Sequence, residues 1–94
     1  MINNYEGLFI INPELKEDDL KNISKLIGDS ITKNGGSLTK EENWGKRLLA
    51  YSVKKFKEGY YYKADFSAPA DAIAKLEAAY KLNADILRMM ITKR

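Results

Sequence analysis

The middle of the chain reads "WGKRLLAYSVKKFKEGYYY", residues 44–62, and this stretch decides the fold because it predicts a β-hairpin. Apolar and other side chains alternate over residues 48–53, which is the period of a strand. "KKFKEG", residues 54–59, is expected to form the turn, and "YYYKADFSA", residues 60–68, returns as the next strand. Gly45 lies inside the first of these strands and predicts a bulge or bend there.

Upstream of the hairpin the sequence predicts a strand followed by a helix. "YEGLFIIN", residues 5–12, has apolar centres on both faces, which is typical of a central strand. Residues 16–34 then carry apolar side chains at helical spacing, and Gly35-Gly36 is expected to end that helix. The first strand of the hairpin begins in "SLTKEENWG", residues 37–45, whose polar alternation is typical of an edge strand.

Downstream of the hairpin a second helix and strand follow. Pro69 is expected at the helix start, and residues 70–83 place a buried stripe on one side of the helix. The members of this stripe are Ile73, Leu76, Ala79 and Tyr80. "ADILRMMITKR", residues 84–94, alternates as a last strand. The order β-α-β-β-α-β predicts one domain over residues 1–94, an α+β ferredoxin-like fold with a four-stranded antiparallel sheet ordered 4-1-3-2 and two helices on one face.

Two helices cover only one face of such a sheet, so the other face is open to water or to a partner. The side chains expected there are Glu6, Leu8, Ile10, Tyr61, Lys63, Asp65, Arg88, Met90 and Thr92. Their apolar members form a larger patch than a monomer needs. A protein partner is the favoured interpretation, and the alternative is that long side chains at the rim cover the patch. The residues predicted to meet the partner are Leu8, Ile10, Tyr61, Lys63 and Met90.

The positive charge of the chain is clustered. Residues 40–63 hold seven cations against three acids, and residues 88–94 hold three cations and no acid, although the net charge is only +3. Phosphate backbones respond to such local patches. The chain has no histidine and no cysteine, which removes the commonest general base, the commonest transition-metal ligand and any disulfide. The lack of histidine makes catalysis less expected without excluding it, and, without an export signal or apolar span, we expect a cytoplasmic location.

"GKRLLAYSVK", residues 45–54, resembles the signature segment of the sixth protein of the bacterial small (30S) ribosomal subunit. That pattern has glycine, a basic residue, leucine, a small residue, tyrosine, a β-branched residue and a basic residue, with Val53 here in place of the usual isoleucine. "YEGLFIINP", Gly59-Tyr60, Pro69 and "DILRMMITK" match the same family, so the resemblance covers the whole chain.

The resemblance implies a structural constituent of the small subunit that has no cofactor, membrane or small-molecule substrate. Such a protein binds the central domain of 16S ribosomal RNA together with the eighteenth small-subunit protein, as a heterodimer. The cations expected to contact RNA are Lys46, Arg47, Lys54, Lys55, Lys57, Arg88, Lys93 and Arg94. The alternatives are a solvated hairpin and, for Arg88, an ion pair with Glu6. Leu49 and Tyr51 are expected to pack and pin the hairpin, and Trp44 either buries or offers a face to a partner.

Two other functions compete with this one. "KEGYYYKADF", residues 57–66, favours a module like the RNA-recognition motif, which stacks single-stranded RNA on its open sheet. Glu58 stands where that motif needs a basic residue, and Lys63 stands where a second ring belongs. A small enzyme or ligand-binding domain of the same fold is the third interpretation. "INPEL" after the first strand lacks the glycine-rich or basic loop that phosphate chemistry needs.

Overall fold

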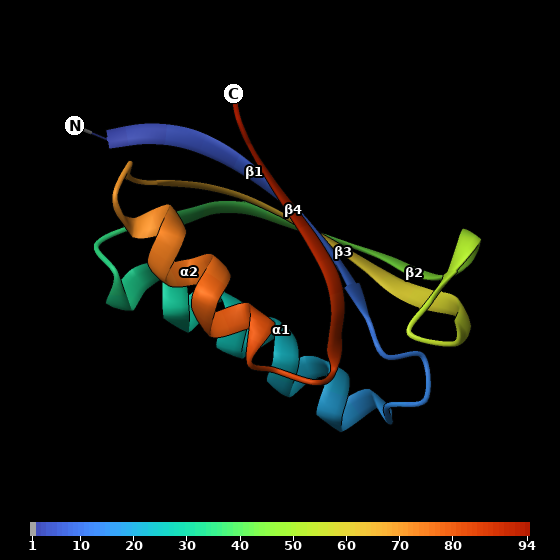
Figure 1. Cartoon of the computed structure of the whole chain (residues 1–94). Helices are drawn as coiled ribbons and strands as arrows, with labels where there is room; N and C mark the ends of the chain where they lie inside the picture. Colours follow the sequence, from blue (N-terminus) through green and yellow to red (C-terminus); the bar gives the residue numbers. More distant parts are fainter. Residues whose placement is uncertain (1) are drawn as a thin grey trace.

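The computed structural model of the chain describes residues 2–94, apart from the side chain of Val53, whose predicted orientation lies outside the described part. Its elements are β1 (Ile2–Ile11), α1 (Glu17–Lys33), β2 (Ser37–Val53), β3 (Phe56–Pro69), α2 (Ala72–Lys81) and β4 (Ile86–Lys93). The antiparallel sheet has the order β2-β3-β1-β4, which is the predicted order read from its other edge. Both helices lie on one face (Figure 1), so the predicted fold class is confirmed.

Helix α1 forms because its apolar residues recur on one side and its end has a glycine stop. Ile27 and Ile31 are fully buried one turn apart on this side. Gly35 takes a φ of 86°, and the N–H of Gly36 donates to the carbonyl of Ile31 at 2.9 Å. This is a Schellman ending, which satisfies carbonyls that the last helical turn leaves free. Leu26 lies outside the buried stripe and is exposed.

The core lies between the helices and the covered face of the sheet. Phe9 of β1 meets the rings of Tyr62 and Tyr80, with centroids 6.0 Å and 5.2 Å away. The hydroxyl of Tyr80 donates to the carbonyl of Ile27 at 3.0 Å, which ties α2 to α1. Burial raises the pKa of both the Tyr62 and the Tyr80 phenol. One expected core position is wrong, because Ala79 is exposed, and the buried side of α2 includes Ala72 instead.

Two of the predicted boundaries are wrong. The turn expected over residues 54–59 is confined to Lys54 and Lys55, because both take positive φ (49° and 73°) and a two-residue turn of this kind matches the twist of the strands it joins. Pro69 does not start α2; it ends β3, opposite Ile2. A proline is tolerated there because the sheet pairing stops at its own position.

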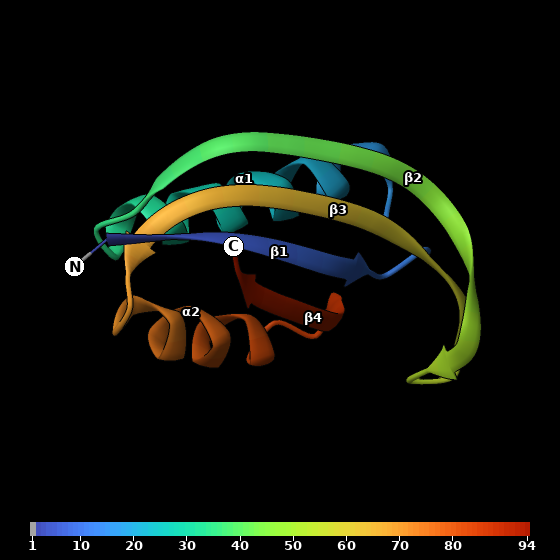
Figure 2. The same cartoon turned by 90° about the horizontal axis from the view of Figure 1, so that it is seen from above.

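The predicted break at Gly45 is confirmed as a β-bulge. Asn43 lies opposite Tyr62 and Gly45 opposite Tyr61, so Trp44 is the extra residue of β2. Gly45 has a φ of 79°, which favours glycine, and its N–H donates to the side-chain oxygen of Asn43 at 3.0 Å. Beyond this point β2 and β3 continue past the end of β1 as a curved two-stranded arm (Figure 2). Neither helix of residues 2–94 has the length and hydropathy needed to cross a bilayer.

Candidate functional site

The face of the sheet away from the helices, here called the open face, carries the predicted apolar patch. Ile10 lies opposite Tyr61 and Leu8 opposite Met90 in the strand pairing. The structure adds Trp44, whose ring stands nearly parallel to that of Tyr61 with centroids 6.3 Å apart. Met90 is 52% exposed and Trp44 41% exposed. We call Leu8, Ile10, Trp44, Tyr61 and Met90 the apolar patch.

A row of ion pairs lies beside the apolar patch. Lys63 binds Glu6 at 2.8 Å and approaches Glu42 at 4.0 Å, and Lys40 lies 3.4 Å from Glu42. The hydrogen bond with Lys63 lowers the pKa of the Glu6 carboxyl, and the same bond raises the pKa of Lys63. A hydrogen bond from the indole of Trp44 lowers the pKa of Glu42. Lys63, predicted as a partner contact, is thus held by two acids of its own chain.

The far end of the open face, near both termini, contains a nearly buried acid. Asp65 is 8% exposed, although the sequence placed it simply among open-face residues. Its Oδ2 lies 3.4 Å from a guanidinium nitrogen of Arg94. The hydroxyl of Thr39 donates to the main-chain carbonyl of Asp65 at 2.8 Å. Arg94, predicted to contact RNA, is therefore paired with an acid in the free chain.

The predicted alternative for Arg88, an ion pair with Glu6, is wrong because of the strand register. Arg88 lies opposite Ile10, whereas Glu6 lies opposite Thr92 and binds Lys63. Arg88 is exposed and lines a hollow of about 570 Å³ between β4, α2 and the turn of the arm. Lys54 and Lys81 line the same hollow, with Glu77 as its acid. The sequence missed Lys81, since nothing local indicates that α2 ends beside the arm.

The remaining hairpin cations do not share one surface. The ammonium of Lys46 lies over the ring of Tyr60, 5.4 Å from its centroid, whereas the side chain of Arg47 donates to the carbonyl of Trp44 at 3.3 Å. Lys46, Lys55 and Lys57 line a second hollow, of about 400 Å³, on the arm. Lys93 sits on β4 opposite Tyr5. The predicted RNA-binding residues are thus spread over separate sites rather than gathered in one.

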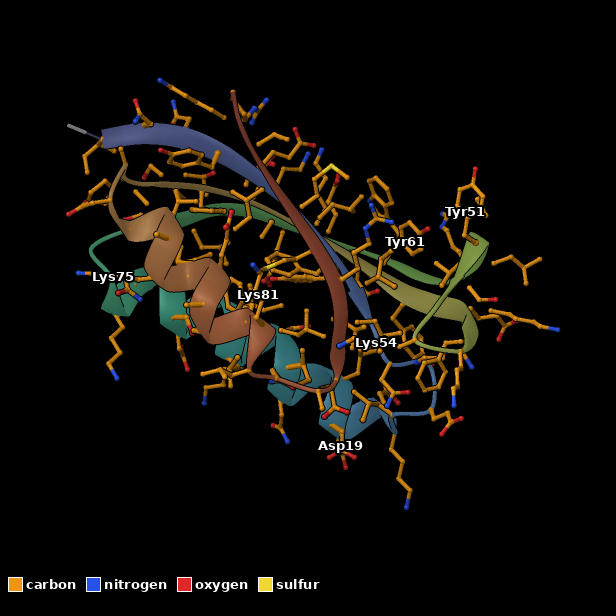
Figure 3. All side chains as sticks on the ribbon, viewed as in Figure 1. Asp19, Tyr51, Lys54, Tyr61, Lys75 and Lys81 are labelled. Carbon is orange, nitrogen blue, oxygen red and sulfur yellow. The ribbon has the colours of Figure 1, made fainter. Side chains whose placement is uncertain are left out.

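Tyr51 does not pin the hairpin, so that prediction is wrong. Its side chain is 81% exposed and projects from the arm (Figure 3), because the arm extends beyond β1 and has no other strand to pack on. Leu48 is also exposed, at 77%, while Leu49 is half-buried. Among residues 2–94, no three acidic side chains lie close enough together to hold a metal ion.

These features define a ferredoxin-like α+β protein whose uncovered sheet face combines apolar, aromatic and ion-paired side chains. The profile of the family described as ribosomal protein S6 matches residues 4–93. The chain therefore belongs to the ribosomal protein S6 family, which confirms the resemblance seen in the sequence. Proteins of this family are structural components of the small ribosomal subunit rather than enzymes.

Relatives and a solved structure agree with this assignment. The small ribosomal subunit protein bS6 of Halalkalibacterium halodurans is 42% identical over 89 residues, which cover 95% of this chain and 94% of the relative. The bS6 protein of Helicobacter pylori is 39% identical over 92 residues, and the match spans 98% of this chain but only 65% of that relative. The crystal structure of 30S ribosomal protein S6 from Thermotoga maritima superposes with a TM-score of 0.94 at 30% identity, covering 100% of this chain and 89% of that one.

Proposed function

We propose that this chain binds the central domain of 16S ribosomal RNA together with the eighteenth small-subunit protein, in the cytoplasm, during assembly of the small subunit. The observation that carries the proposal is the apolar patch, which neither helix in residues 2–94 covers (Figure 1). A monomer gains nothing by exposing Trp44 and Met90 on the same face of the sheet as Tyr61. Family membership supports the ribosomal setting of the proposal.

The protein partner fits the apolar patch and the ion pairs next to it. Aromatic side chains and methionine are enriched in interface centres, and a polar rim surrounds them. Trp44 and Tyr61 supply the aromatic centre here, and Met90 supplies an adaptable edge. Glu6 and Lys63 supply the rim. We infer that the partner covers this end of the open face and leaves the cations elsewhere for RNA.

RNA fits the hollow between the arm, α2 and β4. Lys54, Lys81 and Arg88 surround it with only Glu77 to oppose them. Such a site neutralises phosphate without reading bases, so it gives affinity and salt dependence rather than specificity. Tight binding then depends on the partner. We therefore expect the isolated chain to bind RNA weakly, and the heterodimer to bind it tightly.

The experiment that tests the proposal uses Tyr61→Asp, with Leu26→Asp as the matched control. Both replace an apolar side chain by an acid, but Leu26 is exposed on α1, away from the open face. Heterodimer formation is measured by isothermal titration, and folding by circular dichroism. We expect the Tyr61→Asp protein not to bind the partner. We also expect it to be absent from the small-subunit fraction of a sucrose gradient. Unchanged partner binding by the folded Tyr61→Asp protein refutes the proposal.

One observation favours the single-stranded RNA module as a second candidate. Trp44 stacks against Tyr61, so the open face carries two rings rather than the single one expected from the sequence. Bases stack on such rings in RNA-binding modules. A short single-stranded RNA titrated into the free chain separates the two candidates. Tight binding that Trp44→Ala abolishes, without any partner protein, would favour the module.

A further inference from the structure

The end of the open face near both termini holds a carboxylate with an unused acceptor. Oδ1 of Asp65 is buried and has no hydrogen-bond partner among the described residues. Oδ2 has one long contact, at 3.4 Å, to Arg94. A buried carboxylate is costly unless hydrogen bonds satisfy both of its oxygens. Asp65 is therefore suited to a ligand that brings hydrogen-bond donors.

The surroundings of Asp65 restrict what that ligand is. A cavity of about 180 Å³ adjoins it, lined by Asn4, Tyr5, Thr39, Asp65, Phe66 and Arg94. Lys40 lies opposite Asp65 on β2 with its side chain 65% exposed, and the Arg94 side chain is 56% exposed. The cations beside the cavity are Lys40, which also pairs with Glu42, and Arg94, while Glu6 lies opposite Asp65 on β1 and binds Lys63. A nucleotide offers phosphate to these cations and base donors to Asp65.

We propose that Asp65 recognises the Watson–Crick edge of an unpaired guanine in RNA, an inference that rests on the proposed function. Guanine presents N1–H and N2–H side by side, so both oxygens of one carboxylate can accept from it. Adenine and cytosine instead place a ring-nitrogen acceptor beside their amino group, and uracil has a carbonyl on each side of its single N–H. A carboxylate repels these acceptors, so none of the three bases can donate two hydrogen bonds to it. Unpaired bases read on this edge are the usual target of sequence-specific RNA binding.

Arg94 has a second role in this proposal. Its single contact with Asp65 covers the carboxylate in the free chain. When guanine takes the two carboxylate oxygens, the guanidinium is released to the neighbouring phosphate, for which its planar donors are suited. Arg94 then contributes to affinity for any base, and Asp65 contributes the preference for guanine.

The test is a titration of the folded, full-length chain with the five-nucleotide RNAs UUGUU, UUAUU and UUIUU, where I is inosine, which lacks the N2 amino group. Amide chemical shifts around Thr39 and Asp65 report binding. We expect guanine to bind about tenfold or more tightly than adenine, as a bidentate contact provides, with inosine in between. Asp65→Asn is expected to abolish the preference, and the matched Asp29→Asn on α1 to keep it. Arg94→Gln is expected to weaken all three RNAs alike and keep their order.

Equal affinities for the three RNAs, or a guanine preference that survives in folded Asp65→Asn, overturn the proposal. Shifts around Asp65 that respond to the partner protein and not to RNA also overturn it, because the acid then serves a side chain of the partner. These results leave the proposed function standing if the heterodimer still forms and enters the small subunit. Failure of the unmodified chain to bind the partner or to enter the subunit refutes the proposed function instead.

Discussion

The indole ring of Trp44 and the phenol ring of Tyr61 lie 6.3 Å apart between centroids, with only 16° between their planes. The two rings come from adjacent strands, β2 and β3, and the bulge before Gly45 is what places them together. They form one continuous aromatic surface on a face that the helices leave open. A partner that packs on this surface can therefore contact both rings at once.

Trp44→Ala should weaken binding of the partner protein by about 2 kcal/mol or more, roughly 30-fold in Kd, as expected for a central interface tryptophan. The free energy of unfolding should fall as well, because Trp44 is only 41% exposed and its ring stacks on Tyr61 in the free chain. Trp44→Phe is the control that keeps an aromatic ring, although a smaller one, and removes the N–H bond to Glu42. Isothermal titration of both variants measures the difference. A Trp44→Ala protein with the parent's affinity would exclude Trp44 from the interface.

Glu6→Gln should lower stability at neutral pH and have no effect in acid. The bond to Lys63 depresses the pKa of Glu6 below its ordinary 4.5, so this contribution is fully present above that value and is lost as the pH falls through the folded-state pKa. The raised pKa of Lys63 keeps the same contribution up to its ordinary 10.5 and removes it at higher pH. Urea unfolding of parent and variant should therefore differ at pH 7 and converge in acid, below the folded-state pKa of Glu6.

Glu17→Gln is the matched control for that experiment. Its ion pair with Lys21 is 3.9 Å long and almost fully solvated, so its removal should change little at any pH. Equal effects of the two substitutions at pH 7 would show that the Glu6–Lys63 pair contributes no more than an ordinary surface pair.

Gly45→Ala and Gly36→Ala should differ in cost because their surroundings differ. A Cβ on Gly45 meets nothing within 4 Å, so its cost is the backbone strain of a φ of 79°, about 1 kcal/mol. A Cβ on Gly36 would lie 2.6 Å from the main-chain oxygen of Ser67, which cannot move without shifting β3. We expect this second substitution to cost at least about 2 kcal/mol. Urea denaturation ranks the two, and the reverse order would contradict the packing described here.

Much of the fold could be predicted because its signals are local. The alternation around Phe9 and the spacing of Ile27 and Ile31 each define an element within a few residues. The bulge was also readable, since Gly45 interrupts an alternating strand. The face that Trp44 occupies could not be predicted. One extra residue changes which face a strand residue occupies, and the sequence does not show where the pairing shifts.

The geometry of the site could not be predicted, because it depends on the register between strands that are far apart in the sequence. Arg94 reaches Asp65 only because β4 pairs with β1, and β1 with β3, in one particular register. The same register separates Arg88 from Glu6. The exposure of Tyr51 follows from the length by which β2 and β3 exceed β1. Each of these is a relation between elements rather than a property of one segment.

Lys54→Gln and Arg88→Gln should each reduce the salt dependence of RNA binding by the heterodimer. Both side chains line the hollow between the arm and β4, where they are positioned to meet phosphate. Each lost phosphate contact should lower the slope of log affinity against log salt by roughly 0.7 to 0.9, without changing the preference among RNA sequences. Lys33→Gln, at the exposed end of α1, is the control and should keep the parent's slope. If Lys54→Gln and Arg88→Gln also keep the parent's slope, the hollow is a solvated surface. The RNA is then held by Lys46, Lys55 and Lys57 on the arm instead.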